Sequence, residues 1–493
     1  MAKKRPATLG ELKASGYTSR TIKEEMRQNL ISAMRKGEKI FSGIHGFEHT
    51  VIPDLERAIL SRHSILLLGL RGQAKTKIAR LLIRLLDEYM PIVAGSELND
   101  DPLSPVSRVA MDIIEEHGDQ TPIEWVHRDK RYIEKLATPD VSVADLIGDV
   151  DPIKAATLKL PYSDERVIHY GLVPRAHRSI FVINELPDLQ ARIQVSLFNI
   201  LQENDLQIRG FTFRIPLDIQ FVFTANPEDY TNRGSIITPL KDRIESQIIT
   251  HYPVTLEIAE AITKQEADLA PEQKESITTP SMISRLLERI SFEARESEYV
   301  DEKSGVSARL SISGMENLIS AAERRLLKNG ADLAQVRLSD FWGVIPAITG
   351  KIELVYEGEQ EGPYNVALKL LGEAIKKEFL HYFPHPDRKK KNQDQDPFGT
   401  IRAWFSAGNS IELSNDCSEE DYVRSLKSVA GLEKLVQDYK VPKAEKAVYM
   451  ELVLHGLAEF NQLNKDFMDF QLSFSDILAN MWNDMDEDDD DFE

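Results

Sequence analysis

The chain has 493 residues, a length that predicts two or three domains, each able to bury its own core. Its formal net charge of −20 argues against a nucleic-acid-binding protein, and no apolar stretch approaches the length of a membrane span. The single cysteine, Cys417, and an N-terminus without the apolar core of a signal peptide predict a cytoplasmic protein.

Charge and hydropathy divide the chain into segments. We expect an N-terminal helical extension at 1–40, an α/β domain at 41–252, a helical lid domain at 253–355, a mostly α-helical C-terminal region at 356–482 and an acidic tail at 483–493. The polar stretch at 384–397 has prolines near both ends and predicts a linker. Ser418 followed by Asp421 predicts a capped helix start.

The α/β domain is predicted from three short apolar runs, Ser64–Leu68, Ile180–Asn184 and Gln220–Thr224. Continuous apolar runs are typical of buried parallel strands, so we expect a parallel sheet covered by helices on both faces. The apolar residues that follow Lys75 have helical spacing, and Pro91 is expected to end that helix.

The octapeptide GLRGQAKT, at 69–76, follows a predicted strand and opens a predicted helix. This is the context that a P-loop requires, because backbone N–H groups and a helix N-terminus can cradle phosphate oxygens there. We expect ATP to bind at this loop, with Lys75 bridging the β- and γ-phosphates and the Thr76 hydroxyl coordinating Mg²⁺. The residues assigned to the nucleotide are Gly69, Leu70, Arg71, Gly72, Gln73, Ala74, Lys75, Thr76 and Lys77.

Ala74 stands where the P-loop pattern has glycine. If this position needs a left-handed backbone, alanine costs roughly 1–2 kcal/mol, whereas alanine is harmless if only a small side chain is needed. The competing interpretation of the octapeptide is a glycine-containing turn with an accidental lysine. Strand, loop and helix in succession favour the P-loop.

The apolar run at 179–184 ends in Asn184 and is followed by Glu185. In P-loop ATPases a strand of this kind ends in Asp-Glu, and its aspartate supports Mg²⁺. We expect Glu185 to be the general base and Asn184 to support the metal through its amide oxygen, with one negative charge missing. An Asn-Glu pair at a strand end is common in proteins, so its functional interpretation depends on its place after the P-loop.

Three further side chains are candidates for the γ-phosphate end of the site. Asn226 is expected to hold the attacking water or the γ-phosphate, and the alternative is an Asn-Pro turn. Arg243 is expected to reach the nucleotide of a neighbouring subunit and to stabilise the transition state, although an isolated arginine is usually a solvated surface charge. Arg309 is expected to contact the nucleotide from the lid; its alternative is a surface arginine near a helix start.

In this order the motifs resemble those of AAA+ ATPases of the helix-2-insert clade, which includes the magnesium chelatase ATPase subunit and the MoxR proteins. The resemblance covers roughly residues 38–350 and is carried by GLRGQAKT, ATPDVSVADLIGDVDPIK, IHYGLVPRAHRSIFVINELPDLQARIQVSLFNILQE, FTANPEDY, TPLKDRIES and SARLSISG. It implies a P-loop AAA+ domain followed by a helical lid, with an insert at 138–178 that faces a ring pore or client. It also implies roles for the second motif (Asn184, Glu185), the first sensor (Asn226), the finger (Arg243) and the second sensor (Arg309).

The resemblance further implies ATP and Mg²⁺ as cofactors and self-association into a ring, commonly a hexamer, because the finger completes a neighbour's site. The segment GSELNDDPLSPVS is more similar to the chelatase subunit than to the shorter MoxR proteins. The region from about 356 is not covered by the resemblance, and no D-x-S-x-S motif occurs in the sequence. The client is therefore left open as a partner protein, with an integrin-like domain as one option.

The leading hypothesis is an ATP-hydrolysing motor that remodels a partner protein or drives metal insertion into a cofactor held by a partner. The alternative is a nucleotide-gated assembly scaffold with little hydrolysis, because Asn184 lacks the expected charge. On the motor hypothesis, Glu185→Gln abolishes turnover and Asn184→Asp raises it. A transcriptional activator that remodels sigma factor is disfavoured, since its GAFTGA loop is not found in the sequence.

Overall fold

The computed structural model describes residues 5–206, 208, 214–227, 235–387, 396–468 and 471–477. The chain divides into two compact units, residues 1–252 and 253–493. The predicted acidic tail and residues 388–395 of the predicted linker lie outside the described residues. Over the described part of the chain, no helix combines the length and the apolar character needed to cross a membrane.

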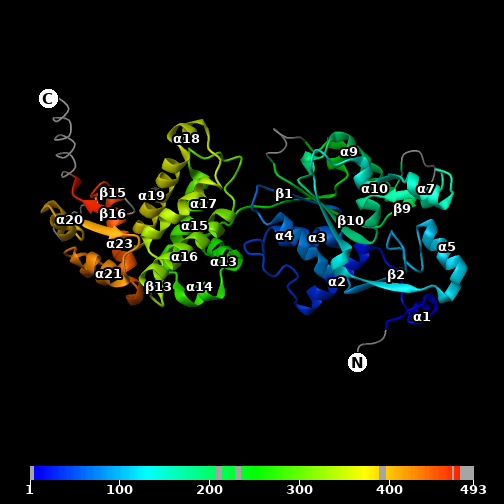
Figure 1. Cartoon of the computed structure of the whole chain (residues 1–493), viewed down its shortest axis with the longest axis horizontal. Helices are drawn as coiled ribbons and strands as arrows, with labels where there is room; N and C mark the ends of the chain where they lie inside the picture. The colour runs from blue at the N-terminus through cyan, green and yellow to red at the C-terminus, as the bar shows by residue number, and fades with distance from the viewer. Residues whose placement is uncertain are drawn as a thin grey trace. The chain divides into compact units, whose positions relative to one another are not determined.

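The first unit is built on a parallel sheet with the strand order β11-β1-β10-β7-β4. Its strands β1 and β10 are labelled in Figure 1. The strands are β1 (Ile65–Leu68), β4 (Tyr132–Leu136), β7 (Ser179–Asn184), β10 (Ile219–Ala225) and β11 (Ser246–Ile249). The three apolar runs predicted as strands are β1, β7 and β10, which lie side by side at the centre of the sheet. The predicted α/β class is therefore confirmed.

Helices cover both faces of this sheet, because alternate residues of each strand point to opposite sides. Ile65 and Val182 lie in one core with α2, α3 and α4. Leu66, Phe181 and Phe223 lie in the opposite core with α8, α9 and α10. The helices of this unit include α1 (Leu9–Ala14), α2 (Ile22–Lys36), α3 (Val51–Leu60), α4 (Lys75–Leu81), α5 (Arg108–His117), α6 (Val143–Leu146), α7 (Pro152–Leu158), α8 (Leu172–Arg175), α9 (Ala191–Ser196), α10 (Phe198–Glu203) and α12 (Thr238–Asp242).

The helix after the P-loop is shorter than predicted. It ends at Leu81 and continues as one 3₁₀ turn, η1 (Leu82–Leu85), whose Leu82 and Leu85 are still buried. Pro91 does not end it but lies in strand β2, where the two-stranded pairing leaves room for a residue without an N–H. The antiparallel pairs of this unit are β2 (Tyr89–Val93) with β3 (Ile123–His127), β5 (Gly148–Val150) with β6 (Ile168–Tyr170), and β8 (Asp205–Leu206) with β9 (Ile215–Pro216).

The N-terminal helix α2 is fixed to the first unit by buried polar contacts. Glu25 accepts two hydrogen bonds from Arg131, at 2.7 and 2.6 Å, and both side chains are almost completely buried. The carboxylate of Asp218 accepts the N–H of Ile22, the first residue of α2, at 2.7 Å. Residues of α2 therefore belong to the same core as β1 and α4.

The second unit is mainly helical and has one continuous core. Its helices include α13 (Leu256–Glu266), α14 (Pro271–Ser276), α15 (Ser281–Glu296), α16 (Arg309–Asn329), α17 (Ile345–Thr349), α18 (Tyr356–Glu361), α19 (Pro363–Tyr382), α20 (Gly399–Ser406), α21 (Glu419–Ser428), α22 (Leu432–Asp438) and α23 (Lys446–Glu459). The capped start predicted at Ser418 is confirmed, because its hydroxyl accepts the N–H of Asp421 at 3.1 Å.

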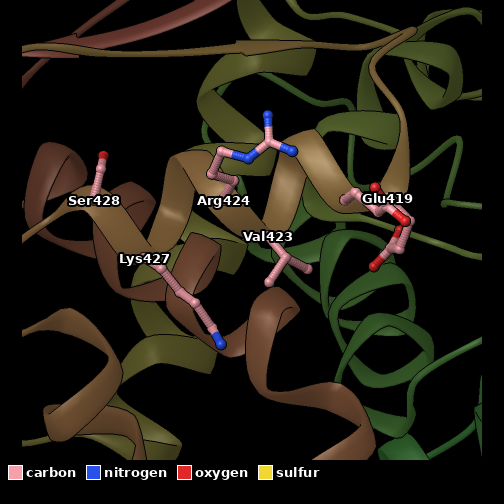
Figure 2. A pocket seen from close by; sticks show the side chains of 6 residues that line it. Glu419, Val423, Arg424, Lys427 and Ser428 are labelled. Atoms are coloured by element: carbon pink, nitrogen blue, oxygen red, sulfur yellow. The ribbon is translucent and has the colours of Figure 1, made fainter.

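Short strands that the sequence did not predict also occur in the second unit. They are β12 (Ile277–Thr278) with β13 (Ala334–Gln335), and an antiparallel sheet of β14 (Ile411–Ser414), β16 (Gln471–Ser475) and β15 (Asn464–Met468). A shallow hollow follows α21 and is drawn in Figure 2. Its lining residues, Glu419, Glu420, Val423, Arg424, Lys427 and Ser428, all come from this one helix, so it is an open surface rather than a built ligand site.

Candidate nucleotide site

The loop 69–76 joins the carboxyl end of β1 to the start of α4 and folds around its own lysine. Lys75 is 7% exposed, and its Nζ donates to the carbonyl oxygen of Gly69 and, at 3.0 Å, to that of Leu70. The ammonium group therefore lies inside the turn that the sequence assigns to phosphate.

Residues that follow β11 hold the other side of the loop. A β-carbon at Gly69 would meet Thr250 Oγ1 at 2.0 Å and Gln73 Oε1 at 2.2 Å, so a larger residue would displace both side chains. Thr250 Oγ1 donates to Gln73 Oε1 at 2.7 Å, and Tyr252 Oη donates to the carbonyl of Arg71 at 2.9 Å. Sequence reasoning did not find Thr250 or Tyr252, because their role depends on β11 lying beside β1.

The backbone at Ala74 is left-handed, with φ 56° and ψ 14°. Gly72, two residues earlier, also has a positive φ, of 75°. The first of the two alternatives for Ala74 is thus the one found, and its methyl group carries a strain of about 1–2 kcal/mol.

Three neighbouring strands end at the same edge of the sheet. Leu68 pairs with Ala225 across β1 and β10, and Phe223 pairs with Ile183 across β10 and β7. The residues that follow these strand ends, which include the P-loop, Glu185 and Asn226, therefore lie at one edge. In open α/β sheets the crevice outside this edge is where ligands bind.

Glu185 and Asn226 have local environments that differ from ordinary turns. Glu185 has a left-handed backbone, with φ 54°, and its N–H donates to Thr224 Oγ1 at 3.2 Å. The Oδ1 atom of Asn226 is buried and has no hydrogen-bond partner among the described residues. A buried amide oxygen without a donor costs free energy, so Asn226 has the capacity to accept a hydrogen bond from a ligand.

Asn184 is buried and has both ends of its amide occupied. Its Oδ1 accepts the hydroxyl of Thr224 at 3.1 Å, and its Nδ2 donates to Glu134 Oε1 at 2.6 Å. Asn184, which stands on β7 where an aspartate was expected, is thus hydrogen-bonded to the carboxylate of Glu134 on β4. Glu134 was missed at the sequence level, although a glutamate within a half-buried strand was a signal for it.

Two further groups hold the Glu134 carboxylate. Arg80 Nε on α4 donates to Oε2 at 3.0 Å, and Tyr132 Oη donates to the same oxygen at 3.1 Å. The hydrogen bond and the ion pair that Arg80 makes with Glu134 raise the pKa of the Arg80 guanidinium. Burial, followed by the charge of Glu134, raises the pKa of the Tyr132 phenol, which therefore stays protonated and donates.

The two predicted arginines lie in different parts of the chain. Arg243 follows α12; its Nε donates to Gln202 Oε1 at 3.0 Å and its guanidinium lies 4.7 Å from the ring centre of Phe198. Both partners belong to α10, so the side chain has a defined direction. Arg309 is the exposed first residue of α16 in the second unit, where its N–H donates to Ser307 Oγ at 3.2 Å.

The parallel sheet with helices on both faces, with the loop 69–76 after β1 and polar residues after β7 and β10, is the α/β architecture that the motif resemblance predicts. The fold expected from the motif resemblance is therefore confirmed. The second unit supplies the helical C-terminal region that was predicted to follow it.

No protein-family model matches the sequence. Solved structures similar to the chain include one described as a putative ATPase from Cytophaga hutchinsonii (19% identity, 73% of this chain, 97% of that chain, TM-score 0.27). Others are a complex of subunits BchI and BchD of magnesium chelatase (20% identity, 65% and 98% covered, TM-score 0.33) and NtrX from Brucella abortus (14% identity, 71% and 66% covered, TM-score 0.36). At these TM-scores the fold assignment rests on the chain's own sheet order and loop.

Proposed function

We propose that this protein is an ATP-hydrolysing motor whose nucleotide site is the edge of the sheet formed by the P-loop, Glu185 and Asn226. The observation that carries the proposal is the convergence of these three elements on adjacent strand ends. A P-loop alone supports nucleotide binding, whereas a carboxylate and an amide beside it supply the groups that hydrolysis needs.

The residues present fit a nucleotide with Mg²⁺. Lys75 and the loop N–H groups would hold the phosphates, and Thr76 with Asn184 would hold the metal site. Within the described part of the chain nothing donates to the buried Oδ1 of Asn226, which can therefore accept a hydrogen bond from a water or from the ligand. When bound, Mg²⁺ neutralises charge on the phosphates.

Glu185 is the proposed general base. Glu185 comes directly after β7, and β7 lies beside β10, which in turn lies beside the P-loop strand β1. A carboxylate in this position can orient and deprotonate the attacking water. The backbone N–H of Glu185 donates to Thr224 Oγ1, and this contact fixes the position from which the carboxylate side chain extends. Asn226 would hold the same water from the end of β10.

Arg243 is the proposed finger in a ring, with a hexamer as the expected form. Among the described residues its guanidinium is held by α10 and by the carbonyl of Pro239 and has no acidic partner, which leaves the charge available to an incoming phosphate. Arg309 is proposed as the second sensor. In such a ring, ATP binding and hydrolysis change subunit contacts, and a client that binds the states unequally is remodelled. We propose a cytoplasmic protein client, or a metal-insertion partner of the kind that the chelatase-like motifs suggest.

Steady-state ATPase measurements on wild type, Glu185→Gln and a control, Glu203→Gln, test the motor. Glu203 is an exposed glutamate at the end of α10. We expect slow turnover in wild type and in the control, and loss of turnover in Glu185→Gln with nucleotide binding retained. Turnover no higher in wild type than in Glu185→Gln would reject the motor and leave the nucleotide-gated scaffold.

The client is best sought with the same variant. Glu185→Gln loaded with ATP should hold its partners, because the site binds nucleotide and cannot turn it over. An affinity pull-down with ATP, compared with one using Lys75→Ala, identifies proteins that depend on the nucleotide state. Recovery of a protein with an integrin-like domain would favour metal insertion over general remodelling.

A further inference from the structure

We propose that Glu134 carries the negative charge that the metal side of this site lacks at Asn184, so that the supporting carboxylate has moved from β7 to the neighbouring strand β4. The proposal rests on the proposed function, since it concerns how that site holds Mg²⁺. Glu134 is thus a positioning residue, acting through Asn184 and its surroundings.

The relevant side chains lie on one face of the sheet. Glu134 pairs with Val182 across β4 and β7, and Val182 belongs to the core that α4 covers. Asn184 lies two residues after Val182, and side chains two apart in a strand share a face. Thr224 stands in the same relation to Val222, a member of the same core. The hydrogen bonds that Asn184 makes with Glu134 and Thr224 follow from this arrangement.

The same face meets the helix that carries the predicted metal ligand. Arg80, which binds Glu134, comes one helical turn after Thr76 on α4, and residues four apart lie on the same side of a helix. Glu134 is therefore tied to the Thr76 side of α4 and to the end of β7 at once. These are the two elements between which the expected aspartate would act.

The charge balance supports this location. The Glu134 side chain is 21% exposed, whereas Arg80, its cationic partner, is 63% exposed and well solvated. A solvated ion pair is screened, so Arg80 offsets only part of the carboxylate's field. Tyr132 and Asn184 contribute neutral donors. The Glu134 carboxylate is thus only partly neutralised near the end of β7, where a divalent cation is expected.

A purely structural interpretation is that Glu134 only satisfies the buried amide of Asn184 and a surface arginine. The two interpretations differ in the sign of one effect. If Glu134 is structural, removing either Glu134 or Arg80 weakens the same network. If Glu134 acts by charge, losing Arg80 removes a positive charge from the site and strengthens Mg²⁺ binding.

The proposal also changes the expectation for Asn184. An aspartate there was expected from sequence to raise turnover, but it would place two carboxylates within about 3 Å of each other, and they would repel. In Asn184→Asp with Glu134→Gln, the hydrogen bond is kept with its donor and acceptor exchanged. That double variant returns one carboxylate to the site without the repulsion.

The test measures Mg²⁺ dependence of nucleotide binding, using a fluorescent ATP analogue titrated with MgCl₂ or held in EDTA. Glu134→Gln should raise the half-saturating Mg²⁺ concentration about tenfold, the scale typical of groups that support a metal ligand, with nucleotide affinity in EDTA unchanged. Arg80→Met should lower it. The Asn184→Asp/Glu134→Gln pair should return it to within about twofold of wild type. Thermal unfolding checks that each variant is folded.

Equal Mg²⁺ dependence in Glu134→Gln and wild type, or a rise with Arg80→Met as well, would overturn the role of Glu134 and leave the motor intact. A wild-type protein that binds no nucleotide, with or without Mg²⁺, would overturn the proposed function and this inference together. If Glu134→Gln unfolds, Arg80→Met still separates the two interpretations, because the charge role and the structural role predict opposite changes in its Mg²⁺ dependence. Failure of a folded Asn184→Asp/Glu134→Gln pair to bind Mg²⁺-nucleotide as wild type does also contradicts the proposal.

Discussion

Thr250 Oγ1 occupies the space that a β-carbon on Gly69 would need, since the two atoms would lie 2.0 Å apart. The hydroxyl is held there by its hydrogen bond to Gln73 Oε1, within the P-loop. Gly69 is not among the residues with a positive φ, so its glycine is required by side-chain contact rather than by backbone conformation. The end of β11 thus sets the shape of a loop that begins at the end of β1.

Gly69→Ala should therefore disturb the P-loop. Overpacking of this kind typically costs about 1–3 kcal/mol of unfolding free energy, and we expect nucleotide binding to weaken at least about tenfold. Thr250→Ala in the same chain removes the closest contact and should recover part of both losses. Calorimetry and a fluorescent-nucleotide titration check this, and a Gly69→Ala protein that matches wild type would contradict it.

Ala74→Gly should stabilise the first unit. Glycine removes the left-handed strain of about 1–2 kcal/mol, and its larger unfolded-state entropy takes back about 0.4–1 kcal/mol. The net gain of about 1 kcal/mol corresponds to a rise of about 2–4 °C in Tm. The matched control is Ala79→Gly on the same helix, where φ is ordinary and the change should destabilise by about 1 kcal/mol. Shifts of the same sign in both variants would refute the strain argument.

Arg243→Ala should bind nucleotide normally and lose most of its hydrolysis. If the arginine acts on a neighbour's site, mixing it with Glu185→Gln should restore activity, although each variant alone is inactive. A mixed ring contains interfaces where one subunit supplies Glu185 and the next supplies Arg243. Fingers acting between proteins contribute roughly 10³–10⁵-fold, so even a small fraction of such interfaces is detectable. No recovery on mixing would place the role of Arg243 within its own subunit or remove it.

Much of the first unit could be predicted because its information is local. Buried parallel strands are continuous apolar runs, and the P-loop has its strand and helix adjacent in sequence. The order β11-β1-β10-β7-β4 then brings the predicted Glu185 and Asn226 to the edge where the loop lies. The helix end predicted at Pro91 is wrong, because α4 ends at Leu81 and Pro91 lies in the strand that follows.

What could not be predicted depends on contacts between distant segments. Glu134 reaches Asn184 only because β4 pairs with β7. Thr250 reaches the P-loop only because β11 pairs with β1. The left-handed backbone of Ala74 is a property of the folded loop, and an alanine in the sequence does not indicate it. Strands β14 and β16 are short and pair across more than 50 residues of intervening chain, so they have no local signature.

The pair Asp218 and His177 predicts a compensated pH dependence of stability. Desolvation raises the pKa of Asp218 from 3.8 to about 6, and it lowers the pKa of His177 from 6.5 to about 4. The two are neighbours, because the N–H of Asp218 donates to His177 Nδ1 at 2.9 Å. Asp218 favours the folded state most below about pH 4, and this contribution is lost as pH rises to about 6. His177 favours it above about pH 6.5, and this contribution is lost as pH falls to about 4.

The two contributions oppose each other over the same window, so single variants should reveal them. Asp218→Asn removes the contribution to stability that decreases as pH rises. Relative to wild type, it should gain roughly 2–3 kcal/mol of unfolding free energy between pH 4 and pH 6.5, at about 1.4 kcal/mol per pKa unit. His177→Gln, whose amide oxygen can still accept the N–H of Asp218, should lose a similar amount over the same range. Urea unfolding at several pH values measures both slopes, and parallel pH profiles for wild type and the two variants would show that neither group is coupled to folding.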